Sequence, residues 1–204
     1  MGKFLTAICL VSFISLSTAS LKKSKFIPWE LGECLINDYI QIKEFDAEKF
    51  FNGTWYELFN YETYLFDMKG KCTALQSKIS DNNVDILFYQ YSYNQSKWET
   101  LKGFTLLKEM EGSEFMVQYP TFDELHHITI PYSVVYTDYD NYAVFYSCQS
   151  IYGMKLEMSW VSTRQRGDLS KYLDIEQVLA RSGLNFILFD VSVQESCDHD
   201  EPKL

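Results

Sequence analysis

The chain has 204 residues, of which 17% are aromatic, and its 18 basic and 28 acidic side chains give a net charge of −10. This acidic balance argues against nucleic acid or anionic lipid as a partner, because both need a basic surface. The aromatic content suits the pleated surfaces of a small all-β protein, and it also suits the lining of a ligand cavity.

Residues 1–20 have the features of a secretory signal peptide. Lys3 provides a positive start, residues 4–16 are mostly apolar, and residues 17–19 are small enough for a cleavage site. The apolar run is too short for a membrane span, and no other stretch approaches the ~20 apolar residues that a span needs. We therefore expect a secreted, extracellular protein without a membrane span, in which residues 21–204 form one domain.

Four cysteines remain after Cys9 leaves with the signal peptide: Cys34, Cys72, Cys148 and Cys197. An even number of cysteines in a secreted chain predicts two disulfides, and three pairings are open from the sequence alone.

The first part of the mature chain has little regular structure. Residues 26–45 mix apolar and polar side chains without a clean period, which favours an extended strap laid against a barrel and pinned by Cys34. Residues 45–50 are consistent with one helical turn, for which Asp46 is the N-cap.

Short apolar strands then alternate with turn signals every ten to fifteen residues, a spacing typical of an antiparallel sandwich or barrel. Eight strands are expected, at residues 55–64, 71–80, 84–93, 97–108, 113–119, 128–137, 142–150 and 155–163. Many of them are apolar on both faces, as at residues 86–89. We therefore expect the inward residues to line a cavity, and the helix or the strap to cover some of the outward ones.

One convincing helix follows the strands. Leu169, Tyr172, Leu173, Ile175, Val178 and Leu179 recur at helical spacing, which predicts a helix over residues 169–182 that docks on the barrel and ends at Gly183. Residues 185–190 are expected to form a last short strand, and the remainder is a tail.

Three motifs mark this region: Gly53-Thr54-Trp55, Thr137-Asp138 followed by Tyr142, and Trp160-Val161-Ser162-Thr163-Arg164. Together they resemble the lipocalin family, specifically its insect extracellular members of the bilin-binding and apolipoprotein-D-like type. The resemblance implies an all-β fold: an eight-stranded antiparallel up-and-down barrel with one C-terminal helix packed on its wall.

The resemblance also assigns structural roles. Arg164 is expected to stack on Trp55 and close one end of the barrel, and the turn at Thr137, Asp138 and Tyr142 is expected to return to that end. In the turn, Asp138 can accept backbone N–H bonds, and Asn141 is a residue type that tolerates the left-handed conformation.

Among the three cysteine pairings, the family resemblance implies Cys34–Cys148 and Cys72–Cys197. Each bridge closes a loop of more than a hundred residues, for which chain entropy alone corresponds to roughly 4–5 kcal/mol.

Strand alternation indicates which side chains face a ligand. If Cys148 points outward, its neighbour Ser147 and then Phe145 point inward, and the same period directs Trp160 and Met158 inward. The predicted ligand-binding residues are Glu57, Phe59, Phe88, Phe145, Ser147, Met158 and Trp160.

The sequence offers no catalytic motif: it has no His-Glu-x-x-His, no Gly-x-Ser-x-Gly and no phosphate loop. We assign no catalytic residue, no metal site and no required cofactor, although His126 or His127 as a haem ligand is a weaker alternative. Two glycosylation sequons begin at Asn52 and Asn94.

The resemblance implies binding, with carriage or sequestration, of a small hydrophobic ligand in the barrel, and biliverdin or a related tetrapyrrole is the leading candidate. One alternative is a carrier of a lipid or pheromone. Another is a salivary-type lipocalin that captures small host mediators or blocks a protein partner. A third, an enzyme of the prostaglandin-isomerase type, requires a free cysteine.

Overall fold

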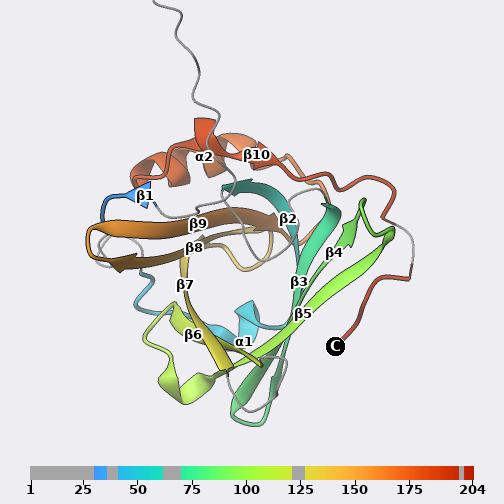
Figure 1. Ribbon diagram of the computed structural model, residues 1–204, viewed down its shortest axis with the longest axis horizontal. Helices are drawn as coiled ribbons and strands as arrows, with labels where there is room; N and C mark the ends of the chain where they lie inside the picture. The colour runs from blue at the N-terminus through green and yellow to red at the C-terminus, as the bar shows by residue number, and fades with distance from the viewer. Residues whose placement is uncertain (1–29, 36–40, 62–69, 121–126, 198–199) are drawn as a thin grey trace, which may run out of the picture.

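Eight antiparallel strands close into a barrel (Figure 1). The computed structural model describes residues 30–35, 41–61, 70–120, 127–197 and 200–204, and the predicted signal peptide lies outside these ranges. Each strand pairs with the next along the chain, and β9 pairs back with β2, which confirms the predicted up-and-down barrel. The barrel strands are β2 (Gly53–Tyr61), β3 (Gly70–Ser80), β4 (Asn83–Ser92), β5 (Lys97–Leu106), β6 (Glu114–Pro120), β7 (His127–Thr137), β8 (Tyr142–Ile151) and β9 (Met154–Thr163).

Side-chain alternation builds the core inside the barrel. In β6, Phe115, Val117 and Tyr119 are buried, whereas the intervening Met116 is 43% exposed. The same period-2 pattern in the other strands collects one interior cluster. Its buried members are Phe50, Phe51, Trp55, Leu75, Val84, Ile86, Phe88, Phe115, Val117, Tyr119, Tyr132, Val134, Ala143, Phe145, Met158 and Trp160.

The C-terminal helix α2 (Tyr172–Arg181) packs on the outside of the barrel, along β8 and β9 (Figure 1). Its Ile175, Val178 and Leu179 are buried in a second cluster with residues such as Val144 and Val161. This outer cluster explains why the strands beneath the helix are apolar on both faces. No helix within the described residues is long and apolar enough to cross a membrane.

The helix is shorter than the sequence pattern predicts. The Asp168 carboxylate accepts a 2.8 Å hydrogen bond from the Ser170 backbone N–H, which makes residues 168–170 a turn. The helix therefore begins at Tyr172 rather than at Leu169. Leu169 and Leu173 are 55% and 69% exposed, so the prediction that they belong to the docking face is wrong.

Of two shorter predicted segments, the helical turn before β2 is confirmed and the strand after α2 is not. Helix α1 (Ala47–Phe50) has Asp46 as its N-cap, as expected, with the Lys49 backbone N–H donating to the Asp46 carboxylate at 3.0 Å. The strand predicted at residues 185–190 is wrong. The Asn185 side chain accepts from the Ile187 backbone N–H and starts a 3₁₀ turn, η3 (Phe186–Leu188), before a two-residue strand, β10 (Asp190–Val191).

Neighbouring strands part at two places in the barrel wall besides the junction of β5 and β6, which pair only at Phe104↔Gln118. β2 and β3 pair only from Gly53↔Ser77 to Tyr56↔Ala74. β7 and β8 pair only as far as Ser133↔Tyr146, which leaves the first residues of β7 and the last residues of β8 without mutual ladder bonds. The first gap is filled by the chain itself, because β10 pairs with the free edge of β2, while β1 (Glu30–Leu31) extends the sheet beyond β9. The second gap positions the pocket described below.

Gly103 in β5 allows a close approach between strands. A Cβ atom at this position would lie 2.8 Å from the Tyr119 ring and 2.9 Å from the Gln118 carbonyl oxygen. Because Gly103 has no side chain, the Tyr119 ring fits into the interior of the barrel. There the Tyr119 and Tyr132 hydroxyls share a 2.9 Å hydrogen bond.

Candidate functional site

Arg164 and Trp55 close one end of the barrel. The guanidinium carbon lies 3.6 Å from the centroid of the fully buried indole. Arg164 also donates to the backbone carbonyls of Lys49 and Phe50 at 3.1 and 3.0 Å, and the indole N–H donates to the same Phe50 carbonyl at 3.2 Å. Burial lowers the pKa of Arg164 to about 10, so the group stays charged at neutral pH. This arrangement is the one that the motif implies, and its role is structural.

The neighbouring turns hold the same end in place. Gly53 has a φ of +104°, and a Cβ there would lie 3.7 Å from a guanidinium nitrogen of Arg164. The Asp138 carboxylate accepts backbone N–H bonds from Asn141 and Tyr142 at 2.8 and 3.1 Å. Burial works to raise the pKa of Asp138, but a hydrogen bond from the Asn141 side chain, together with the backbone N–H bonds, outweighs it and lowers the pKa. The left-handed residue of this turn is Tyr139, at φ 66°.

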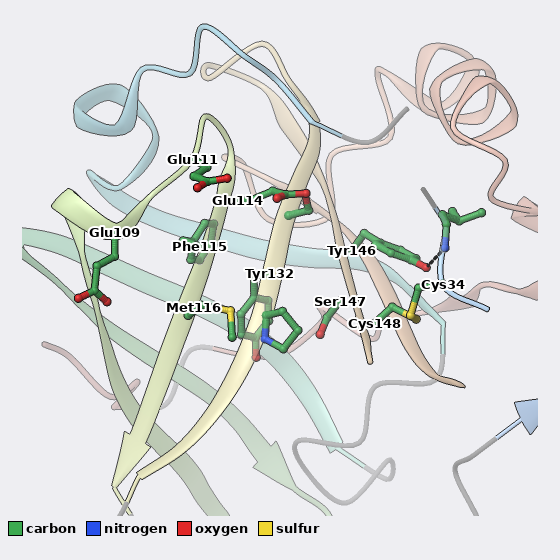
Figure 2. Close-up of a pocket in the computed structure, with 13 residues that line it drawn as sticks. Cys34, Glu109, Glu111, Glu114, Phe115, Met116, Tyr132, Tyr146, Ser147 and Cys148 are labelled. Atoms are coloured by element: carbon green, nitrogen blue, oxygen red, sulfur yellow. Dashed lines mark hydrogen bonds between the residues drawn. A yellow bond between two sulfur atoms is a disulfide. The ribbon is translucent and has the colours of Figure 1, made fainter. Parts of the chain in front are cut away.

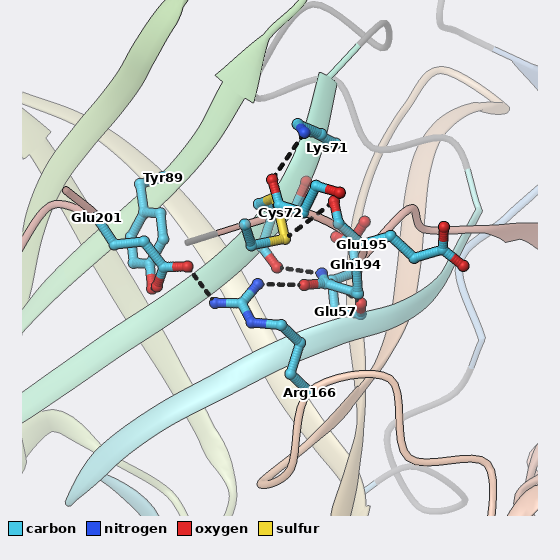
Figure 3. A network of polar contacts seen from close by, with 11 residues as sticks. Glu57, Lys71, Cys72, Tyr89, Arg166, Gln194, Glu195 and Glu201 are labelled. Atoms are coloured by element: carbon cyan, nitrogen blue, oxygen red, sulfur yellow. Dashed lines mark hydrogen bonds and ion pairs between the residues drawn. A yellow bond between two sulfur atoms is a disulfide. The ribbon is translucent and has the colours of Figure 1, made fainter. Parts of the chain in front are cut away.

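The C-terminal segment seals the gap between β2 and β3 (Figure 3). The Cys72 backbone N–H donates to the Val193 carbonyl at 2.7 Å, and the Gln194 side chain donates to the carbonyls of Glu57 and Thr73 at 2.7 and 2.8 Å. These bonds satisfy backbone groups that β2 and β3 no longer supply to each other. Arg166 joins the network through Gln194 and Glu201, and its guanidinium carbon lies 4.2 Å from the Tyr56 ring centroid.

Glu57 is buried beneath this segment. Its carboxylate accepts hydrogen bonds from the Ser192 hydroxyl at 2.6 Å and from the Asn60 amide at 3.1 Å. Burial raises the pKa of Glu57 to about 7, and the two hydrogen bonds only partly offset that effect. The carboxyl is therefore partly protonated at neutral pH.

The structure contains two disulfides, Cys34–Cys148 and Cys72–Cys197. These are the pairings that the family resemblance implies, and they tie the N-terminal and C-terminal segments to the barrel wall. Since all four cysteines of the described residues are paired, none of them offers the thiol that the prostaglandin-isomerase alternative requires.

The interior of the barrel is occupied by aromatic side chains. Phe145 and Trp160 stack with ring centroids 5.2 Å apart and planes 9° apart, and Tyr132 meets Trp160 edge-on at 5.5 Å. Among the described residues this core encloses a space of only about 10 Å³, roughly enough for one water molecule. Its walls are Phe51, Leu75, Ile86, Phe88, Phe115, Val117, Tyr132, Phe145 and Trp160.

A larger pocket opens where β7 and β8 part, and we call it the β7–β8 pocket (Figure 2). Its volume is about 390 Å³, and it is lined by Cys34, Leu35, Glu109, Glu111, Glu114, Phe115, Met116, Pro131, Tyr132, Ser133, Tyr146, Ser147 and Cys148. Phe115 and Tyr132 line both this pocket and the small interior space. The Tyr146 hydroxyl fixes one side of the β7–β8 pocket by accepting a 3.0 Å hydrogen bond from the Leu35 backbone N–H.

The structure separates the predicted ligand-binding residues into groups. Phe88, Phe145, Met158 and Trp160 lie in the interior cluster, and Ser147 lines the β7–β8 pocket. The inward placement of Phe59 is wrong. A register shift between Glu57 and Phe59 turns Phe59 outward, where its ring packs edge-on against Phe186 at 5.1 Å. Glu57 lines none of the described pockets and is hydrogen-bonded to the C-terminal segment instead.

Several pocket residues are absent from the sequence prediction. Strand alternation identifies Phe115 and Tyr132 as inward-facing, so a period-2 reading of β6 and β7 would have found them. Glu111 and Glu114 carry no such signal. Their place in a pocket depends on where β7 and β8 stop pairing, which no local pattern records.

The closed barrel, the Trp55–Arg164 plug and the external helix define a protein of lipocalin type. The family model described as Triabin matches residues 26–167, and the chain belongs to this family. Apolipoprotein D of Macaca fascicularis is 27% identical over 175 residues, which cover 83% of this chain and 86% of that protein.

Solved structures share the fold. Insecticyanin from the tobacco hornworm Manduca sexta has a TM-score of 0.67 at 20% identity, and the match covers 80% of this chain and 87% of that one. The amine binding protein of Rhodnius prolixus, in complex with tryptamine, has a TM-score of 0.62 at 18% identity, with coverages of 79% and 86%. At these identities the likeness concerns the fold alone.

Proposed function

We propose that this protein is a secreted carrier that binds and sequesters a small, largely apolar molecule. One observation carries the proposal: the β7–β8 pocket, about 390 Å³ in volume, leads to the aromatic rings of Phe115 and Tyr132. Its volume lies within the range of about 300–1,000 Å³ that is usual for small-molecule sites. The proposal includes export and assigns no enzymatic activity, and it leaves open whether Asn52 and Asn94, both exposed, carry glycans.

The size of the pocket favours a compact ligand. Biliverdin or a related tetrapyrrole is the candidate that the sequence resemblance implies. To enter the barrel, such a molecule would have to displace rings such as Phe145 and Trp160, because they leave only about 10 Å³ between them and their neighbours. A one- or two-ring molecule fits the β7–β8 pocket without that rearrangement, as would suit the capture of small mediators. The tryptamine complex of a protein with the same fold supports a ligand of this size.

Protein purified from its native source provides the test. We expect mass spectrometry of the native protein, and then of an organic extract, to reveal a co-purifying small molecule, with no bilin bands in the visible absorption spectrum. Strong visible bands would favour the tetrapyrrole candidate over the compact ligand. Native protein without any bound molecule, together with recombinant protein that binds no apolar fluorescent probe, would contradict the proposal.

A second candidate function is the blocking of a protein partner. The tip of the β8–β9 hairpin exposes Ile151, Tyr152 and Met154, and Leu31 of β1 lies beside them through its pairing with Met154. Exposed apolar side chains that gather in one place are typical of interaction surfaces. A photo-reactive residue at position 152 should then cross-link a discrete protein in the native fluid, whereas the same residue at position 176 of α2 should not.

A further inference from the structure

A groove lies at the end of the barrel that Arg164 and Trp55 close, and we call it the closed-end groove. Its volume is about 630 Å³, within the range of about 300–1,000 Å³ that is usual for small-molecule sites. It is lined by Lys49, Asn52, Thr54, Tyr56, Tyr139, Asp140 and Arg164. The surface that these residues present is mostly polar, so the groove suits a hydrophilic occupant.

The groove contains the first glycosylation sequon of the chain. Asn52 and Thr54 are the first and third residues of this sequon, and both line the groove. Asn52 is exposed, and within the described part of the chain neither its side-chain amide nor the Thr54 hydroxyl makes a hydrogen bond. The two side-chain groups that an N-glycosylation site requires are therefore free in the folded protein.

The backbone of the sequon is fixed, although its side chains are free. Arg164 donates to the carbonyls of Asn52 and Thr54 at 3.2 and 3.4 Å, and Gly53 between them has a φ of +104°. A sugar attached to the Asn52 amide nitrogen would thus begin at a fixed point beside the groove. Such preorganisation lowers the entropy lost when the sugar settles against the protein.

Arg164 provides a surface for a sugar to cover. Its guanidinium carbon lies 3.6 Å from the centroid of the Trp55 ring. It donates to the backbone carbonyls of Lys49, Phe50, Asn52, Thr54 and Tyr139. Because these donors are already bonded, covering the guanidinium removes few hydrogen bonds to water. The contact with Trp55 would also become stronger, since a cation–π contact gains when water is excluded.

The sides of the groove offer the contacts that a sugar can use. Tyr139 is partly exposed, and its hydroxyl accepts a 3.0 Å hydrogen bond from the Asp46 backbone N–H, which fixes its ring. The C–H groups of a sugar can pack against such a ring. Lys49 and Asp140 are exposed and of opposite charge, so they can bond the hydroxyl and acetamido groups.

The second sequon has different surroundings. Asn94 is exposed in the turn between β4 and β5, and it lines neither the closed-end groove nor the β7–β8 pocket. A glycan on Asn94 would extend into water. It therefore provides a matched control for a glycan on Asn52.

We propose that Asn52 is N-glycosylated during export and that its first N-acetylglucosamine lies in the closed-end groove, over Arg164. The donor is an oligosaccharide joined to a lipid through a diphosphate. The bond between the sugar C1 and the diphosphate oxygen breaks, and the lipid diphosphate leaves with the bonding electrons. C1 bonds to the Asn52 amide nitrogen, which loses a proton. This inference rests on the export that the proposed function includes, and it adds a modification and the place of the sugar.

Protein secreted from cultured insect cells tests the modification. After treatment with a peptide-N-glycosidase in heavy-oxygen water, we expect peptide mass spectrometry to find a labelled aspartate at position 52. Thr54→Ser keeps the sequon and should keep the sugar, whereas Thr54→Ala should lose it. An unmodified Asn52 in the secreted protein would overturn the inference and leave export standing. A chain that is not secreted at all would contradict both.

Variants with one sequon each test where the first sugar lies. They are made in cells that produce high-mannose glycans, and endoglycosidase H trims each glycan to a single N-acetylglucosamine. We expect trimmed Asn94→Gln, which carries its sugar on Asn52, to melt about 2–4 °C above the sugar-free double variant Asn52→Gln/Asn94→Gln. This shift is the one expected in a chain of this size for roughly the stability of one hydrogen bond. Trimmed Asn52→Gln, with its sugar on Asn94, should melt with the double variant.

Two results would overturn the place of the sugar. One is an equal melting temperature for trimmed Asn94→Gln and the double variant. The other is the absence of nuclear Overhauser contacts between the acetamido methyl group and the rings of Tyr56 and Tyr139. Thr54→Ala/Asn94→Gln is a second sugar-free form, and it provides the comparison if the double glutamine variant does not fold.

Discussion

At the scale of single residues, Glu57 links the stability of the fold to pH. Its pKa is about 7 in the folded protein, compared with an ordinary value of 4.5. The folded state therefore holds a proton that the unfolded state has already released between these two values. Stability from this group is complete below about pH 4.5, declines as the pH rises toward 7, and stays low above that. The shift corresponds to about 3 kcal/mol, since one pKa unit is worth about 1.4 kcal/mol.

Replacing Glu57 by Gln should remove this dependence. The amide oxygen of Gln accepts the same hydrogen bonds from Ser192 and Asn60, and it carries no charge. We expect Glu57→Gln to raise the free energy of unfolding at pH 8 by about 1–3 kcal/mol and to leave it almost unchanged at pH 4, as measured by urea denaturation. Glu176→Gln serves as the control. An equal stabilisation at both pH values would show that the proton on Glu57 is not the cause.

The sequence predicted individual residues well where a motif ties two positions together. Trp55 and Arg164 belong to such a motif, and their contact follows from it. The predicted inward orientation of Phe59 is wrong because a register shift in β2 changes the alternation of its side chains. No residue type in this segment indicates the shift.

At the scale of elements, the C-terminal segment acts as part of the wall. It is attached by the Cys72–Cys197 disulfide and by bonds from Gln194 and Lys71, whose ammonium group donates to the Ser196 carbonyl at 2.8 Å. Without the disulfide, the segment should separate more easily from β2 and β3. Glu57 would then meet water, and its pKa should fall toward the ordinary value.

The double variant Cys72→Ala/Cys197→Ala should therefore change two quantities. We expect the free energy of unfolding to fall by about 2–4 kcal/mol. We also expect the free energy of unfolding to depend less steeply on pH between pH 5 and 7, because the segment no longer shields the Glu57 carboxyl from water. The Cys34→Ala/Cys148→Ala variant provides the comparison, since it should lower stability and leave that slope intact. A slope that is the same in both variants would contradict the role given to the segment.

Strands were easier to predict than the helix and the tail. Most strand boundaries fall within two residues of the expected ones, because a period of two together with turn residues marks them locally. The start of α2 depends on one side chain, that of Asp168, which turns the backbone before the apolar repeat can begin a helix. In the same way, Asn185 converts an expected strand into a 3₁₀ turn.

At the scale of the whole molecule, the barrel is a packed core with its pocket in the wall. Trp160 is the centre of this packing, since its ring contacts those of Phe88, Tyr132 and Phe145 at 6.3, 5.5 and 5.2 Å between centroids. The sequence indicated an aromatic interior and could not indicate how full it is. Packing density depends on how side chains from eight strands interdigitate, which the pattern of any one strand does not contain.

Removing this ring should open an empty space inside the barrel. We expect Trp160→Ala to lower the free energy of unfolding by about 3–5 kcal/mol and to create an apolar cavity that binds benzene. Benzene should raise the melting temperature of the variant and leave the unaltered protein unaffected.

Trp98→Ala is the control, because Trp98 packs against Tyr89 and Tyr91 in a cluster separate from the interior one. If benzene stabilises the unaltered protein as much as the Trp160 variant, the interior already has room for a ligand. Trp160→Leu provides the same readout if the alanine variant does not fold.

Gly103 shows how far the shape of the pocket depends on the opposite side of the barrel. Even one methyl group at this position would force the Tyr119 ring or the β6 backbone to move. The Tyr119 hydroxyl is hydrogen-bonded to that of Tyr132, and Tyr132 lines the β7–β8 pocket. Gly103, which has no side chain, therefore affects the shape of a pocket two strands away. Relatives that carry alanine at this position should bind ligands of a different shape.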